Sequence, residues 1–433
     1  MKVLHLETGR SLYGGALQVL YLLEGLQKSA DLPLSPEENP RTPLSPPRKI
    51  RLSPESGDTH PFPDSPWKSA DTHPNSTPPA DSPRAYDPLP ASTGELAEKF
   101  ADTQNPRLGT DPTADTHELV TPPGTALAAA ARERGFRVHE VPFHGDLDFA
   151  AVLRLRRLFR RRGADLVHLH SRRGADLLGA LAARWTPVPA VLSRRVDEPE
   201  RAILLRLKTR LAARVVAISQ AVRSVLVEAG VPDADIEVIP SAVDTHRYAP
   251  DPAAGTYLRR TLGIHRDETV VGMAAQFIPR KGHRVLLQAL PEVIARHPHT
   301  RFVLFGRGPE EETIRSLSRG TPAGEHLLFA GFREDLPDLL PGLDLLVHPA
   351  LREGLGVILL QAAACAVPAV ASRAGGMPEV VRHAETGLLV PPDDPQALAR
   401  ALHDLLDDPE WCHQLGQSAR RRALEHFSLP SLA

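Results

Sequence analysis

Short apolar runs alternate with longer amphipathic segments over most of the chain, and this alternation is typical of a parallel α/β fold. In the first half, the apolar runs that we predict to be strands cover residues 1–7, 117–120, 136–140, 165–169, 190–193 and 215–218. In the second half, they cover residues 269–274, 302–305, 327–329, 343–347 and 368–371. The segments between the runs have helical spacing, so the sequence predicts two Rossmann-like, doubly wound parallel sheets.

The alternation pauses between the run at 215–218 and the run at 269–274, and this pause sets the predicted domain boundaries. We assign residues 1–240 to a first domain, 241–256 to a linker and 257–433 to a second domain. In sheets of this type, ligands bind beyond the carboxyl ends of the strands, and we expect the binding rims of the two domains to face each other across a cleft. The positions that this rule puts on the rim of the first domain include Gly14, Gly15, His170 and Arg194.

Residues 29–115 interrupt the pattern. This segment is rich in Pro, Ser, Thr and Asp and has neither a helical nor a strand period, so we predict a disordered insertion in the first domain. The tripeptide Asp-Thr-His recurs at Asp58, Asp71 and Asp115, which indicates low-complexity expansion. A Pro-rich recognition segment is the functional alternative. We favour a tolerated loop insertion, because loops absorb long insertions at modest entropic cost.

The composition fits two sizeable globular domains. The chain has 433 residues, 42% of them hydrophobic, and a formal net charge of −2, so nothing global favours a nucleic-acid partner. Cys365 and Cys412 provide neither metal-ligand spacing nor a disulfide framework, and no secretion signal accompanies the first strand. We therefore expect a cytoplasmic protein. The uncharged window 354–372 contains Gln361 and Pro368, and we predict a buried helix and strand there, not a membrane span.

The most informative candidate for chemistry is a glycine-bearing turn that contains Glu353. Gly354 and Gly356 let the backbone approach a ligand closely, and the N–H groups at the start of the following helix can donate to anionic or hydroxyl oxygens. Glu353 can accept from hydroxyl groups, or it can cap the helix with a favourable negative charge. Gln361, two turns later, lies near the helical face that carries Val357 and Leu360. From there it could reach the same ligand as Glu353.

Several motifs follow one another along the chain in a recognisable order. Besides the turn at 352–362, they are Gly14-Gly15, the segment 239–244, Lys281-Gly282 and the segment 306–309. In this combination the chain resembles the family-4 retaining glycosyltransferases, which use nucleotide sugars and have the two-domain GT-B fold. The resemblance covers nearly the whole chain outside about residues 29–115. It implies that the second domain binds the nucleotide sugar and the first binds the acceptor, without a resident cofactor or metal.

The resemblance also implies roles for individual residues. Glu353 and Lys281 are the implied catalytic residues: Glu353 would contact a sugar hydroxyl and Lys281 the diphosphate, whereas the alternative for Lys281 is an ordinary surface lysine. Gln361 stands where the family usually has a second glutamate. The implied donor-binding residues are Gln361, Gln276, Arg280, Gly306, Gly308, Gly354, Leu355, Gly356, Gly375 and Gly376.

The same resemblance implies roles for two further sets of positions. Gln276 stands where the family usually has an arginine, and we expect Arg280 to replace part of that charge. Ordinary turns are the alternative for the segment 306–309 and for Gly375-Gly376. The implied contacts on the acceptor or phosphate side are Gly14, Gly15, His170 and Arg194. We assign no general base and predict no metal site, because the sequence shows no metal-ligand spacing.

The implied activity is the retaining, metal-independent transfer of a sugar from a nucleotide diphosphate to a glycan or lipid-linked acceptor. Cell-envelope polysaccharide or lipopolysaccharide assembly is the implied process. Two alternatives remain: a sugar-nucleotide epimerase of the same fold, and a non-catalytic binding protein. The second is motivated by Gln276, Gln361 and a chain that stops at Ala433, where relatives usually continue through a further helix.

One predicted helix carries a dense positive charge. Its arginines are Arg154, Arg156, Arg157, Arg160, Arg161 and Arg162, and its apolar residues form one stripe that we expect to pack inward. The arginines could be a solvated face. They could equally dock the protein on anionic lipid headgroups at the inner face of the membrane, at up to about 1 kcal/mol for each arginine.

Overall fold

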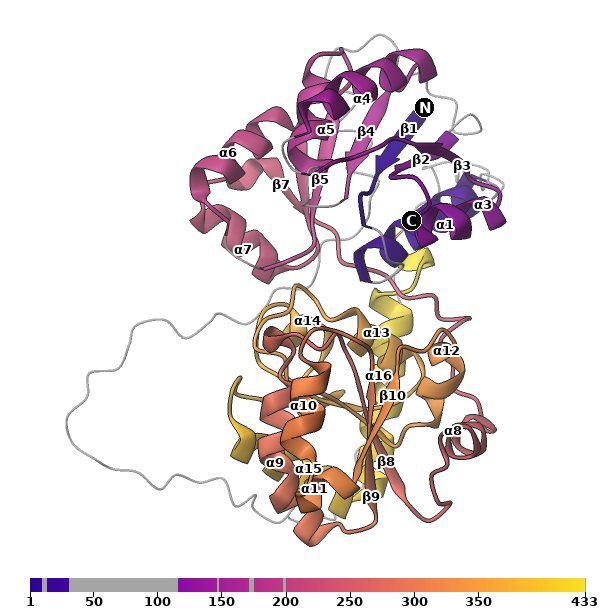
Figure 1. Ribbon diagram of the computed structural model, residues 1–433, viewed down its shortest axis with the longest axis vertical. Coiled ribbons are helices and arrows are strands. Elements are labelled where there is room, and N and C mark those ends of the chain that lie inside the picture. Colours follow the sequence, from indigo (N-terminus) through magenta and orange to yellow (C-terminus); the bar gives the residue numbers. More distant parts are fainter. Residues whose placement is uncertain (10–13, 31–115, 146–147, 171–174, 198–199, 433) are drawn as a thin grey trace, which may run out of the picture. The chain divides into compact units, whose positions relative to one another are not determined.

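The computed structural model describes residues 1–9, 14–30, 116–145, 148–170, 175–197 and 200–432 (Figure 1). The predicted insertion at 29–115 lies outside these residues except for Ser29 and Ala30. These two belong to helix α1 (Gly14–Ala30), so the helix extends into the range that was predicted to be disordered.

The first domain contains a seven-stranded sheet in which all neighbouring strands are parallel, in the order β3-β2-β1-β4-β5-β6-β7. Its strands are β1 (Lys2–Leu6), β2 (Thr116–Thr121), β3 (Arg137–Glu140), β4 (Leu166–Leu169), β5 (Ala190–Arg194), β6 (Arg214–Ala217) and β7 (Ile236–Val238). The direction of winding reverses between β1 and β4. The carboxyl ends of these two strands are therefore where a ligand is expected in such a sheet.

Helices pack on both faces of this sheet (Figure 1). They are α1, α3 (Ala126–Glu133), α4 (Phe149–Arg162), α5 (Ala175–Arg184), α6 (Ala202–Leu211) and α7 (Gln220–Glu228). Leu4 and Leu6 join the core formed with α4 and α5, whereas Leu119 joins the core formed with α1 and α3. Since successive side chains of a strand alternate between faces, His5 of β1 lies on the α1 face.

Helix α4 illustrates how local sequence sets the ends of an element. The Asp148 carboxylate accepts from the Ala151 N–H at 3.1 Å and so caps the amino end of the helix. At the other end Gly163 takes a left-handed conformation, with φ of 60°, which glycine adopts without a steric penalty. The predicted apolar stripe faces inward, because Val152, Leu155 and Phe159 are buried.

The second domain contains a six-stranded sheet, also parallel throughout, in the order β10-β9-β8-β11-β12-β13. Its strands are β8 (Thr269–Ala274), β9 (Thr300–Phe305), β10 (Leu327–Gly331), β11 (Leu345–His348), β12 (Ala369–Ser372) and β13 (Gly387–Val390). The predicted strands are all confirmed, and β7 and β13 are additional.

The helices of the second domain begin inside the predicted linker, because α8 starts at Ala254. They are α8 (Ala254–Leu262), α9 (His283–Arg296), α10 (Glu311–Ser318), α11 (Pro322–Glu325), α12 (Leu336–Leu339), α13 (Val357–Ala364), α14 (Met377–Val380), α15 (Pro395–Asp407) and α16 (Pro409–His426). In the described part of the chain, no helix has the length and apolar content that crossing a membrane requires.

Candidate functional site

The loop between β11 and α13 carries Glu353 at the carboxyl end of the second sheet. Gly356 takes φ of 90°, a left-handed conformation that would strain most other residues, and it ends the loop at the start of α13. Leu355 is buried in the hydrophobic core, so it anchors the loop. The helix begins at Val357, two residues after the predicted start near Leu355.

Lys281 and Glu353 lie together, as expected for two residues of one site. Lys281 Nζ forms an ion pair with Glu353 Oε2, and His348 Nε2 lies 3.2 Å from the same oxygen. Burial by itself would raise the pKa of Glu353, but the charge of Lys281 and the hydrogen bond from His348 outweigh it and hold the pKa well below its usual range. Glu353 is therefore ionised near neutral pH.

A glycine contact brings Lys281 to this loop. Gly282 has φ of 78°, and a Cβ at this position would overlap the carbonyl oxygen of Pro349. The Leu351 N–H donates to the Arg280 carbonyl at 2.8 Å, and Arg280 Nη1 donates to the Arg352 carbonyl at 3.3 Å. Arg280 thus lies beside the Glu353 loop, and its contact with a donor stays a prediction.

The other predicted donor-side glycines make close backbone contacts of the same kind. A Cβ at Gly306 would overlap the Ala275 carbonyl, and one at Gly308 would overlap the Phe277 carbonyl. The exposed Gln276 lies between these two contacts. Turn-to-turn packing is therefore a sufficient reason for glycine at 306 and 308, and ligand contact by these loops stays a prediction.

Gly375 and Gly376 pack against the backbone of the Glu353 loop. The Gly376 N–H donates to the Glu353 carbonyl at 3.0 Å, and a Cβ at Gly375 would overlap that same carbonyl oxygen. Gly375 has φ of 55°, in the left-handed region. Gln361, on α13, is 6% exposed. The two glycines thus contact the Glu353 backbone, and the donor contacts predicted for all three positions stay predictions.

The predicted acceptor-side residues do not all share one environment. Gly14 and Gly15 begin α1, His170 follows β4 and Arg194 ends β5, while the neighbouring segment 171–174 lies outside the described residues. Arg194 Nη1 lies 3.1 Å from Glu200 Oε2, and its Nε donates to the Val196 carbonyl. Arg194 thus takes part in an internal ion network, and acceptor contact by it stays a prediction.

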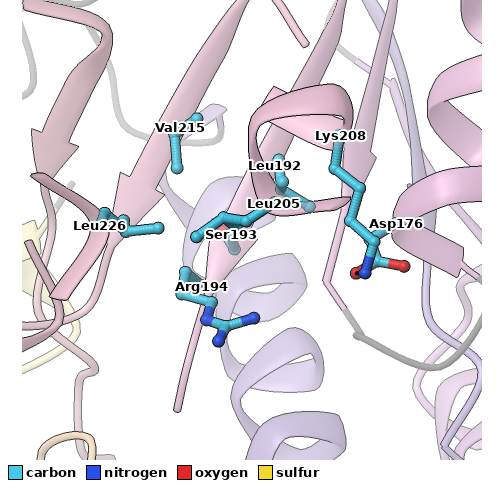
Figure 2. A pocket seen from close by; sticks show the side chains of 8 residues that line it. All are labelled: Asp176, Leu192, Ser193, Arg194, Leu205, Lys208, Val215 and Leu226. Carbon is cyan, nitrogen blue, oxygen red and sulfur yellow. Dashed lines mark hydrogen bonds and ion pairs between the residues drawn. The ribbon is translucent and has the colours of Figure 1, made fainter. Parts of the chain in front are cut away.

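Figure 2 shows the small buried pocket beside Arg194. Lys208 Nζ lies 2.9 Å from Asp176 Oδ2 and also pairs with Glu200, so two basic and two acidic groups share one network. Burial raises the pKa of Asp176, and the ammonium of Lys208 opposes that rise. The network joins α5, β5 and α6. These ion pairs hold the three elements together, whereas a ligand contact by Arg194 stays a prediction.

Two family models match the chain. The model described as Glycosyl transferases group 1 matches residues 256–422, and the model described as Glycosyltransferase Family 4 matches residues 114–247. The GDP-mannose-dependent alpha-(1-6)-phosphatidylinositol monomannoside mannosyltransferase of Mycolicibacterium smegmatis is 34% identical over 313 residues, covering 69% of this chain and 82% of that protein. The chain belongs to the family-4 glycosyltransferases.

Further relatives extend this result. This glycosyltransferase is 26% identical to the N-acetyl-alpha-D-glucosaminyl L-malate synthase of Bacillus anthracis over 289 residues, or 65% of this chain and 75% of that protein. The solved structure of Anabaena HepE in complex with UDP and glucose has a TM-score of 0.70 at 19% identity and covers 100% of this chain and 97% of its own. At that identity the likeness concerns the fold alone, and the predicted GT-B fold class is confirmed.

Sequence reasoning missed His348 as a member of this glycosyltransferase's candidate site. His348 is the last residue of β11 and is 1% exposed. Burial lowers its pKa, although Glu353 opposes this effect. His348 ends an apolar run, so the sequence pattern indicates a core position. Only its place at the carboxyl end of a strand could have indicated a site residue.

Proposed function

We propose that this glycosyltransferase transfers a sugar from a nucleotide-diphosphate donor to a glycan or lipid-linked acceptor, with retention of configuration and without a metal at the donor. The ion pair between Lys281 and Glu353 carries the proposal. In the donor-free protein each group neutralises the other. A bound diphosphate would take the Lys281 ammonium and leave the ionised Glu353 to accept from a sugar hydroxyl.

The reaction needs a group that stabilises negative charge as the diphosphate leaves. Lys281 supplies a positive charge on a side chain that is only 13% exposed, and Arg280 is the preceding residue. The N–H groups at the start of α9 follow Gly282 and add a favourable dipole. These groups support transfer without a resident cofactor or a metal at the diphosphate. No described side chain is assigned as a general base.

A lipid-linked acceptor is supported by one relative and by the exposed surface of helix α4. The Mycolicibacterium relative is described as acting on a phosphatidylinositol mannoside, which is a lipid-linked glycan. On α4, Arg157, Arg160 and Arg161 are exposed, and the large apolar residues Phe149 and Leu153 of the same helix are 63% and 46% exposed. We propose that this surface contacts anionic lipid at the inner face of the membrane, during assembly of a cell-envelope glycan.

The other arginines of α4 are occupied within the protein. Arg154 pairs with Asp148, Arg156 donates to the Trp185 carbonyl and Arg162 pairs with Glu118. The predicted lipid-contacting range 154–162 is therefore narrowed to the three exposed arginines. Trp185, which lies beside Arg156, is 52% exposed and adds an aromatic group of the kind found at membrane interfaces.

The test uses the full chain with GDP-mannose and UDP-glucose as donors, without added Mg²⁺ or Mn²⁺. Phosphatidylinositol monomannoside serves as the first acceptor, and release of the nucleoside diphosphate is measured with and without it. We expect acceptor-dependent release that Lys281→Met abolishes, and a product whose anomeric configuration by NMR matches the donor. Conversion of the donor to another nucleotide sugar without acceptor would replace the proposal with an epimerase. Donor binding without turnover on any acceptor would favour the non-catalytic alternative.

A further inference from the structure

Four histidines gather on the α1 face of the first sheet, at the strands where the winding reverses. His5 of β1 and His168 of β4 are register partners, and His170 follows His168 by two residues on the same face. His117 of β2 is the register partner of Val3, which is two residues before His5 and so also on this face. Three neighbouring strands thus direct imidazole rings to one place.

The ring nitrogens lie close to one another. His5 Nδ1 is 3.0 Å from His170 Nε2, and His5 Nε2 is 3.1 Å from His117 Nδ1. The ring centroids of His168 and His170 are 3.9 Å apart. One ring nitrogen from each of His5, His168 and His170 lies within 4.8 Å of the other two.

The outer contacts of these rings can hold their lone pairs toward a common centre. His168 Nε2 lies 2.7 Å from Ser193 Oγ, so a proton on Nε2 can be donated to the hydroxyl and leave the other nitrogen as an acceptor. In the same way, His5 can donate from Nε2 to His117 and keep its Nδ1 lone pair for a metal, and His170 would then carry its proton on Nδ1 and turn its Nε2 lone pair to the same centre. Outer hydrogen bonds that fix a tautomer and aim a lone pair are characteristic of histidine ligands to metals.

Burial gives these rings the protonation state that a metal needs. His5 is 1% and His170 3% exposed, and in the described part of the chain His170 Nδ1 is buried without a hydrogen-bond partner. Burial lowers the pKa of His5 and His170 well below the usual value and lowers the pKa of His168 to about 3. The rings are therefore neutral near pH 7, and neutral imidazole is the form that binds a metal.

We propose that His5, His168 and His170 form a zinc site that ties β1 to β4. Imidazole ligands suit Zn²⁺, and a site with three histidines leaves a fourth position for water. In a tetrahedral site with Zn–N bonds of 2.0–2.1 Å, ligand nitrogens lie about 3.3 Å apart, so His5 and His170 need to separate by only a few tenths of an ångström. His117 and Ser193 would orient two of the ligands.

The charge around the site is mixed. Arg195 acts electrostatically on His168 and His170 and opposes a divalent ion, whereas the buried Glu7 acts on Arg195 in the opposite sense. The charge of Arg195 that a zinc ion would meet is therefore offset in part by the carboxylate of Glu7. The site lies at the carboxyl end of the first sheet, and it is distinct from the Lys281 and Glu353 pair in the second domain.

The experiment measures zinc in the full chain, purified without an affinity tag because polyhistidine tags bind metals. We expect one zinc per chain by mass spectrometry of the metal content, and absorption bands of tetrahedral Co²⁺ after exchange. His168→Gln should lose both signals. The matched control is His403→Gln, which alters a second histidine pair in which the buried His403 has its Nδ1 3.1 Å from Nε2 of the half-buried His297.

Loss of zinc from His168→Gln would be uninformative if that variant failed to fold, so a second measurement is made on the wild-type protein. In the wild-type protein, chelation with dipicolinate should lower the melting temperature and zinc should restore it, whereas chelation should not move the melting temperature of His168→Gln. The proposal is overturned if the wild-type protein neither retains zinc nor binds it at micromolar concentration, or if both variants lose zinc equally. Either result would identify the cluster as a neutral histidine hydrogen-bond chain. Donor binding is measured separately, so it can fail or succeed independently of this result.

Discussion

Lys281 and Glu353 form an ion pair although 72 residues separate them in the chain. Each was expected to contact a different part of the nucleotide sugar, Lys281 the diphosphate and Glu353 a hydroxyl group. Under the proposed function, a bound donor would therefore exchange partners with the protein. This exchange makes the two residues separable by experiment.

Lys281→Met and Glu353→Gln are expected to change GDP affinity in opposite directions. Loss of Lys281 removes a charge-assisted hydrogen bond and should weaken GDP binding about 30-fold, which corresponds to about 2 kcal/mol. Glu353→Gln releases Lys281 and should tighten GDP binding, but it should weaken GDP-mannose relative to GDP. Calorimetry of both ligands measures this, and a parallel loss of GDP affinity in the two variants would contradict the exchange.

Gln361→Glu is expected to tighten donor binding. A carboxylate accepts from ribose hydroxyls more strongly than an amide, and the gain is on the order of 1 kcal/mol, or about fivefold in Kd. The residue is buried, so the same change should lower the free energy of unfolding of the donor-free protein. Gln361→Ala is the control. If Gln361→Glu leaves the Kd of the nucleotide sugar where it was, Gln361 does not contact the donor.

Acidification should destabilise the fold through His283. This ring stacks on Phe277 with centroids 4.2 Å apart, and burial lowers its pKa to about 3 from the usual value of 6.5. Because the folded protein holds the neutral form, its contribution is fully present above about pH 6.5 and is lost as the pH falls toward 3. The loss for this group approaches about 1.4 kcal/mol per pH unit.

His283→Phe should flatten this part of the pH dependence while keeping the stacked ring. Urea unfolding at pH 7.5, 6 and 5 measures the free energy of unfolding of both proteins. We expect the difference between the wild-type and variant values to grow as the pH is lowered. A constant difference over this range would mean that His283 titrates as it does in the unfolded chain.

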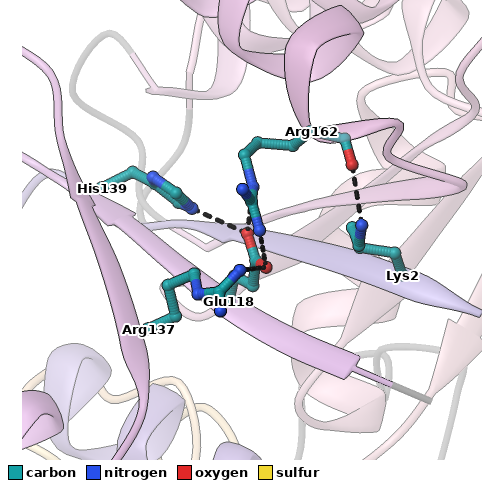
Figure 3. A network of polar contacts seen from close by, with 5 residues as sticks. All are labelled: Lys2, Glu118, Arg137, His139 and Arg162. Carbon is teal, nitrogen blue, oxygen red and sulfur yellow. Dashed lines mark hydrogen bonds and ion pairs between the residues drawn. The ribbon is translucent and has the colours of Figure 1, made fainter. Parts of the chain in front are cut away.

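Glu118 is expected to be worth more to stability than an exposed glutamate. Figure 3 shows its carboxylate accepting from Arg162, His139 and Arg137. Burial would raise the pKa of Glu118, but Arg162 and His139 outweigh it and lower the pKa to about 2. Glu118→Gln should cost about 2–3 kcal/mol, since it leaves Arg162 without its anionic partner.

The matched control for Glu118 is Glu140→Gln. Glu140 pairs with Arg132, and both side chains are substantially exposed, so the change should cost less than about 1 kcal/mol. Urea unfolding at pH 7 compares the two variants. Similar costs for both would show that the Glu118 network adds little beyond a surface pair.

Replacement of Arg157, Arg160 and Arg161 by alanine should weaken sedimentation with anionic vesicles. Removal of three charges, each worth up to about 1 kcal/mol near the surface, should reduce partitioning by one to two orders of magnitude. The combined change Arg266→Ala, Arg319→Ala and Arg382→Ala removes three exposed arginines of the second domain and is the control for net charge. Binding that is indifferent to lipid charge, or that falls equally in the control, removes the proposed membrane surface.

Much of the fold could be predicted because its signal is local. Each predicted strand is an apolar run between turns, and burial of parallel strands on both faces keeps those runs continuous. The missed strand β7 has three residues, Ile236–Val238, with a glutamate in the middle, and its apolar run is too short to stand out. Strand β13 is similarly brief and is followed directly by prolines.

The site was predictable only in part, because contacts depend on pairing between distant segments. Glu353 and Lys281 lie beside glycines that the sequence displays locally, so both could be singled out from the sequence. The ion pair between them and the contact with His348 required the tertiary structure. The histidine cluster required the register of β1 against β2 and β4, although the two-residue spacing of His168 and His170 was a visible sign that both point to one face.

The glycine contacts around Glu353 have a practical consequence for engineering donor preference. At positions 282, 306, 308 and 375, a side chain would overlap a backbone carbonyl of a neighbouring loop. Randomising these positions would mainly yield misfolded loops, so a mutant library gains nothing from including them. The exposed Gln276 lies between two such contacts and has room for larger residues. Because Gln276 is predicted to contact the donor, diversity concentrated there is expected to sample new donor preferences while the loop framework stays intact.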